Sequence, residues 1–117
     1  MRNQRRKLFP DLMESFRNYL DGVKSNKDLY DRSFLYLHTT YPDLGWDIPE
    51  LINEFGLSSK TIVTYRCTNC KLVIPLLYRN ARSHCPRCNN YSLGFPTTQH
   101  GIERQDLAAI YNLFDVF

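Results

Sequence analysis

The chain reads Cys67-Thr68-Asn69-Cys70 near its middle and, after fourteen further residues, Cys85-Pro86-Arg87-Cys88, and these motifs contain all of its cysteines. Two cysteines at this spacing can present both thiolates to one ion, and the segment between the motifs is long enough for a hairpin that brings the pairs together. The sequence therefore predicts one zinc ion held by Cys67, Cys70, Cys85 and Cys88. Because four thiolates leave no position for water or substrate, we expect this zinc to be structural.

Other uses of four cysteines remain open at this point. Two disulfides suit a secreted chain, but the basic first seven residues lead into an amphipathic segment and not into the continuous apolar segment of a signal peptide. A redox-active pair needs only one such motif, and two at this spacing fit a metal better. His84 precedes Cys85 and could replace it as a ligand only by distorting the turn, so we expect it beside the site or facing solvent.

The 117 residues indicate one small domain, and the formal net charge of +3 says little about partners. The distribution of charge is more informative, because no acidic residue lies between Glu54 and Glu103. Counting the thiolates and the ion, this stretch carries about +4. It predicts a mild basic patch that binds nucleic acid, and an ordinary solvated surface is the alternative. Its basic residues are Lys60, Arg66, Lys71, Arg79, Arg82 and Arg87.

No apolar stretch approaches the ~20 residues that cross a membrane, so we expect no membrane partner. With reduced cysteines and no export signal, we expect a cytoplasmic or nuclear protein. Apolar residues recur at helical spacing in four segments, which predicts about four helices. These segments are residues 9–23, 28–41, 47–55 and 102–117.

Residues 48–66 resemble a helix-turn-helix, with the turn at Gly56-Leu57-Ser58 and then Thr61-Ile62. The match departs from that family at Ile52, where a small residue is usual. The resemblance implies a recognition helix from Ser58 whose Lys60, Thr64 and Arg66 reach a major groove. The alternative is a β-strand over 60–66, which the β-branched and aromatic composition favours.

With the strand alternative, the order is strand (60–66), first motif, strand (71–78), second motif and strand (91–95). Residues 60–95 in this order resemble the zinc-ribbon family, which implies a three-stranded antiparallel sheet around one structural zinc. The expected fold is therefore α+β, a small helical core with a zinc ribbon. Residues 1–59 form the helical region, 60–95 the ribbon, and 96–117 a loop and a helix that packs back on the N-terminal helices.

Zinc ribbons are common in the transcription machinery, so the resemblance implies a small transcription regulator or accessory factor that binds nucleic acid, DNA in preference to RNA. The six basic residues would contact phosphates, while Tyr78 and Tyr91 would stack on unpaired bases. The alternative is an interaction subunit that docks on a larger, nucleic-acid-processing complex. The apolar run from Leu72 to Leu77 motivates this alternative.

The stretch from Tyr65 to Leu93 is also similar to the ribbon that ends SprT-like metalloproteases. Those enzymes hold a catalytic zinc with an H-E-x-x-H helix, whereas His38 is followed here by Thr39-Thr40-Tyr41. The similarity thus supports the ribbon but not protease activity. We expect no catalytic residues, no enzymatic activity and no small-molecule substrate.

Overall fold

A long β-strand, β2 (Thr61–Cys67), is the central element of the fold. The computed structural model describes residues 8–41, 43, 45–79, 82–95 and 102–113, apart from the side chain of Arg82. Five of the seven β2 residues are buried, as suits a β-branched and aromatic segment packed on both faces. The strand interpretation is confirmed, and the recognition helix implied by the helix-turn-helix resemblance is wrong.

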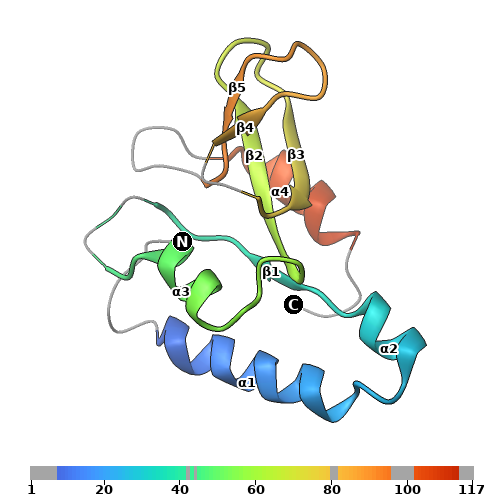
Figure 1. The fold of residues 1–117 in the computed structure, drawn as a ribbon. Coiled ribbons are helices and arrows are strands. Elements are labelled where there is room, and N and C mark those ends of the chain that lie inside the picture. Colours follow the sequence, from blue (N-terminus) through green and yellow to red (C-terminus); the bar gives the residue numbers. More distant parts are fainter. Residues whose placement is uncertain (1–7, 42, 44, 80–81, 96–101, 114–117) are drawn as a thin grey trace.

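Three strands pair with β2 (Figure 1). Strand β3 (Val73–Leu77) runs antiparallel along one edge. The other edge is shared by β1 (Leu35–Leu37), parallel to residues 61–63, and β5 (Tyr91–Leu93), antiparallel to residues 66–67. Strand β4 (Arg82–His84) pairs with β5. The three predicted antiparallel strands are thus present within a sheet of five described strands, to which β1 and β4 are additions.

Proline in β3 fits the hydrogen-bond pattern of this edge. Cys67 N donates to Leu72 O and Tyr78 N donates to Thr61 O, both at 2.8 Å. The even-numbered residues of β3 therefore direct their backbone groups toward β2, and Pro75 directs its nitrogen outward. The missing N–H of Pro75 costs no ladder hydrogen bond, and it makes this edge a poorer template for a further strand.

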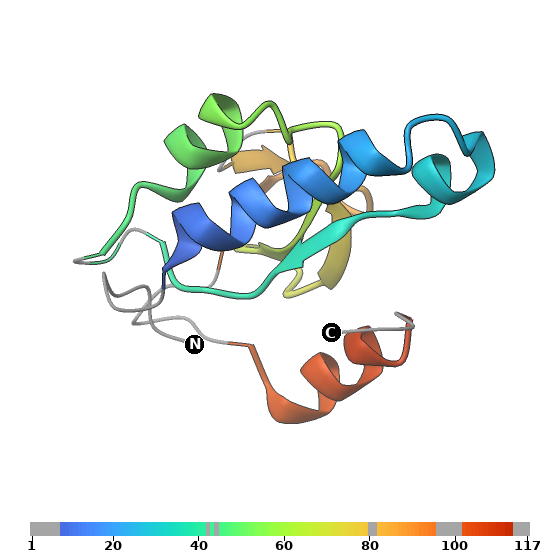
Figure 2. The ribbon, with the colours of Figure 1, turned by 90° about the horizontal axis from the view of Figure 1, so that it is seen from below.

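Helices cover both faces of the sheet (Figure 2). Helix α1 (Phe9–Gly22) contacts α3 (Ile48–Glu54), and both contribute to the main core with the buried side chains of Val63 and Tyr65. Asp47 caps α3 by accepting a hydrogen bond from Glu50 N at 3.1 Å, as its sequence position predicts. The core comprises Phe9, Met13, Leu20, Leu37, Ile48, Leu51, Ile52, Leu57, Val63, Tyr65 and Phe95.

The helix predicted over 28–41 is wrong beyond its first turns. Helix α2 (Lys27–Arg32) begins after an Asn26 cap and ends before Phe34, and the chain continues into β1. Leu35 N donates to Lys60 O at 2.8 Å, so pairing with the segment that leads into β2 satisfies backbone groups that a helix would otherwise have to satisfy. Aromatic residues are also common in strands, so the composition of this stretch is compatible with β1 when β2 is available as a pairing partner.

Helix α4 (Arg104–Tyr111) contacts β3, and Tyr111 packs edge-on against Tyr36 of β1 with ring centroids 6.2 Å apart. The expectation was that it would pack on the N-terminal helices, but Figure 2 shows the sheet lying between α1 and α4. The predicted α+β class with four helices is confirmed for the described residues. Within these residues, no helix combines the length and apolar composition needed to cross a membrane.

Candidate metal centre and basic face

The four cysteine sulfurs form one cluster at the end of the ribbon farthest from α1. All four Sγ atoms lie within 4.8 Å of one another. The Cys67 and Cys88 sulfurs are 3.4 Å apart, and the Cys70 and Cys85 sulfurs are 3.6 Å apart. A tetrahedron of Zn–S bonds of ~2.3 Å has sulfur–sulfur edges of about 3.8 Å. The cluster can therefore hold one metal ion, with ligands from both motifs.

Backbone N–H groups of the two turns point at the sulfurs. Asn69 N and Cys70 N each lie 3.4 Å from Cys67 Sγ, and Arg87 N lies 3.4 Å from Cys85 Sγ. Donors directed at sulfur favour the thiolate over the thiol, which is the form that ligates a metal. The local fold of each motif thus prepares its cysteines for coordination.

The surroundings of the thiols shift their pKa values in different directions. Hydrogen bonding from the Asn90 side chain and backbone lowers the pKa of Cys88 to about 5. The pKa of Cys70 is also lowered, first by the N–H of Leu72 and then by the Arg87 side chain. Burial raises the pKa of Cys67, whose side chain is almost completely enclosed. A divalent cation would supply the positive charge that favours ionisation of this buried thiol.

The residue after each motif adopts a left-handed backbone conformation. Lys71 has φ 65° and Asn89 has φ 64°. Asparagine accepts this region readily, whereas lysine is strained there by about 1–2 kcal/mol. The strain at Lys71 is maintained by the turn that closes around the sulfur cluster.

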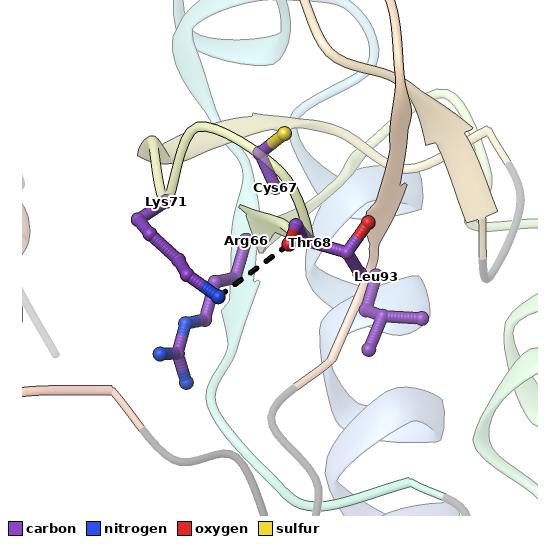
Figure 3. A pocket seen from close by; sticks show the side chains of 5 residues that line it. All are labelled: Arg66, Cys67, Thr68, Lys71 and Leu93. Atoms are coloured by element: carbon purple, nitrogen blue, oxygen red, sulfur yellow. Dashed lines mark hydrogen bonds between the residues drawn. The ribbon is translucent and has the colours of Figure 1, made fainter.

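Two of the predicted phosphate-binding residues converge beside the metal centre. Arg66 and Lys71 line a hollow of about 120 Å³ together with Cys67, Thr68 and Leu93. Figure 3 shows the side chains of Arg66 and Lys71 lying next to each other, with Lys71 Nζ 3.4 Å from the carbonyl oxygen of Thr68. Among the described residues that line this hollow, none is acidic. We call this site the Arg66–Lys71 hollow.

The other predicted basic residues are dispersed. Lys60 is only 7% exposed and its ammonium group donates to the carbonyl oxygen of Tyr30, which disfavours a contact with phosphate. Arg87 donates to the carbonyl oxygen of Cys70 at 3.1 Å and thereby bridges the two motifs. Arg79 is exposed beyond the end of β3, where it lines a groove that His84 and Pro86 also line. The side chain of Arg82 lies outside the described residues.

The two tyrosines proposed for base stacking differ in their surroundings. Tyr78 is partly buried against the core, 6.0 Å from the ring of Phe95, and burial raises its pKa. Tyr91 is 62% exposed, and its ring stacks on that of His84 at 5.3 Å. His84 therefore lies at the surface on β4, next to the metal centre.

Sequence reasoning missed the asparagines that support the cluster. Asn69 Nδ2 lies 3.8 Å and Asn90 Nδ2 3.5 Å from Cys88 Sγ. Asn69 lies within the first motif and Asn90 lies two residues after the second. The cysteine spacing alone does not show that both side-chain amides approach the same sulfur. Their positions depend on the pairing of β2 with β5, which brings the motifs together.

Comparison of the chain with models of known protein families, with curated proteins and with solved structures finds no match.

Proposed function

We propose that this chain is a nucleic-acid-binding protein in which one structural zinc ion, held by the four cysteines, positions a basic surface for contact with phosphates. The observation that carries the proposal is the Arg66–Lys71 hollow. Two cations line one concavity beside the cysteine cluster, and none of the described residues that line it is acidic. A phosphate oxygen placed there would meet a guanidinium and an ammonium group together.

The Arg66–Lys71 hollow lies at one end of one face of the sheet. Arg66 is paired with Val73 on one side and Leu93 on the other, so all three side chains belong to one face of the sheet. Farther along that face, Tyr36 packs against Tyr111 of α4 and hydrogen-bonds Thr64 Oγ1 at 2.6 Å. Helix α4 thus covers the half of the face that includes Thr64, and the half near the metal carries the positive charge.

The more specific role, a small transcription regulator or accessory factor with a preference for DNA over RNA, rests on the zinc-ribbon resemblance. The strand conformation of residues 61–67 argues for contacts with the sugar–phosphate backbone, because this segment does not form the recognition helix that would read base edges in a major groove. Binding that depends on phosphates is weakly sequence-specific and falls steeply with salt.

Lys71→Gln is expected to weaken binding of oligonucleotides and to reduce its salt dependence. The substitution removes one cation from the Arg66–Lys71 hollow and keeps a long polar side chain. Loss of one phosphate contact should lower the slope of log Kobs against log salt by about 0.7–0.9. Fluorescence anisotropy with labelled oligonucleotides at about four salt concentrations measures both quantities.

Lys71→Arg keeps the charge and should retain the salt slope of the unmodified protein. Lys24→Gln is the matched control, because Lys24 is an exposed lysine in the loop after α1. Equal loss of affinity from Lys24→Gln and Lys71→Gln would show a diffuse charge effect and contradict a contact at the hollow. No detectable binding at low salt would contradict the proposed function itself.

A docking role on a larger complex is the second candidate, favoured by a separate apolar groove. This groove of about 510 Å³ is lined by Ile62, Tyr65, Pro75, Leu76, Leu77, Arg79, Ser83, His84 and Pro86. Leu77 is 46% exposed. If a protein partner binds there, Leu77→Asp should abolish recovery of a stoichiometric partner in a pull-down, while Leu12→Asp on the exposed surface of α1 should not.

A further inference from the structure

Beyond the Arg66–Lys71 hollow, the same end of the sheet carries an aromatic stack of Tyr91 on His84. Tyr91 pairs directly with His84 of β4. Leu93, two residues after Tyr91, pairs with Arg66 of β2. Directly paired residues and residues two apart share a face of a sheet. The rings of Tyr91 and His84 therefore lie on the same face as the Arg66 side chain.

Several hydrogen bonds hold this stack in place. The carbonyl oxygen of Tyr91 accepts bonds from Thr68 N at 3.3 Å and Thr68 Oγ1 at 3.0 Å. His84 Nδ1 lies 3.2 Å from the carbonyl oxygen of Asn89, which fixes the plane of its ring. The two rings are inclined by only 23°. The Tyr91 residue is thus largely exposed to solvent although its backbone and its stacking partner are held by hydrogen bonds, which limits the entropy lost when another ring stacks on it.

We propose that this surface selects single-stranded nucleic acid, with a base stacked on Tyr91 and a neighbouring phosphate held at the Arg66–Lys71 hollow. The inference rests on the proposed function and specifies its ligand. Bases of a duplex present only their edges, whereas an unpaired base presents the face that an exposed aromatic ring can stack on. Combining a stacking ring with adjacent cations is the usual chemistry of single-strand binding.

The spacing of the two parts fits one nucleotide unit. Arg66 and Tyr91 are diagonal neighbours across β2 and β5, a relation that separates Cα atoms by about 7–8 Å. Their side chains extend from the same face, so a base on Tyr91 leaves its own backbone within reach of the Arg66–Lys71 hollow. His84 lies behind Tyr91 and supports the ring, which makes it a positioning residue.

The test uses the full-length, metal-loaded protein and four probes of about ten nucleotides: labelled thymidine DNA, uridine RNA, the corresponding DNA duplex, and an abasic DNA strand that keeps its phosphates. We expect the single strands with bases to bind more tightly than the duplex and the abasic strand, each by roughly 5- to 100-fold. The DNA and RNA strands show which sugar is preferred. This comparison needs no variant of the protein.

Substitutions then locate the contact. Tyr91→Ala should weaken binding of the thymidine strand by roughly 5- to 100-fold and leave binding of the abasic strand unchanged. Tyr91→Phe should keep the affinity, because it retains the ring. Tyr19→Ala is the matched control, since Tyr19 is an exposed tyrosine on α1. Metal content and circular dichroism verify the fold of each variant.

The outcomes separate the two proposals. Equal affinity for the abasic and thymidine strands, or for the duplex and the single strand, would overturn the stacking site while leaving phosphate binding intact. Unchanged affinity of a folded Tyr91→Ala protein would do the same. If every probe fails to bind at low salt, both proposals fall together.

Discussion

Removing the metal ion is expected to unfold the ribbon and to abolish the cooperative thermal transition of the whole chain. Structural zinc sites contribute roughly 10–16 kcal/mol of apparent binding free energy, which exceeds the net stability of most small domains. The effect should extend beyond the ribbon because β2 belongs to both parts. Its Cys67 belongs to the sulfur cluster, while its Val63 and Tyr65 lie in the core with α1 and α3.

Chelation under reducing conditions, followed by circular dichroism and thermal denaturation, measures this effect. Metal analysis should find about one zinc ion per chain before chelation, and adding zinc back should restore the transition. Cys85→Ser should reproduce the effect of the chelator. Ser83→Ala, two residues away and in β4, is a control that keeps all four ligands. A metal-free chain that retains its thermal transition would contradict a structural role for the ion.

The metal centre was the feature most fully predictable from sequence, because its signal is local. A turn of fixed length determines how the two cysteines of each motif are presented. The antiparallel pairing of β2 with β3 and with β5 then brings the two motifs together. The cluster of the four sulfurs confirms that expectation. The identity of the ion stays a prediction that metal analysis must test.

Features that depend on contacts distant in the sequence were predicted less well. The segment around Leu35 has helical periodicity, but its backbone pairs with a segment about 26 residues away. Tyr78 and Tyr91 both lie in segments predicted to be strands of the ribbon. In the structure Tyr78 packs on Phe95, whereas Tyr91 is exposed. Local pattern cannot distinguish such cases, because tertiary burial decides them.

Lys60→Ala is expected to lower the free energy of unfolding by about 2–4 kcal/mol, because Lys60 is a buried structural residue. Its ammonium group donates to the carbonyl oxygen of Tyr30 at 2.5 Å. The same group lies 4.2 Å from the ring centroid of Tyr30 and 4.8 Å from that of Phe34. Lys60 therefore stabilises the corner where α2 ends and the chain enters β1, which is where the predicted longer helix stops.

Chemical denaturation of the variant measures the loss, and two further substitutions identify its cause. Lys60→Met keeps the apolar stem but removes the charge, so it should recover only part of the stability lost in Lys60→Ala. Lys27→Ala, at an exposed position of α2, should change stability by less than about 0.5 kcal/mol. Because Lys60 lies apart from the Arg66–Lys71 hollow, folded Lys60→Ala should bind oligonucleotides as the unmodified protein does. A stable Lys60→Ala protein that loses oligonucleotide binding would instead place Lys60 in the nucleic-acid interface, and the basic surface would then have to extend to α2.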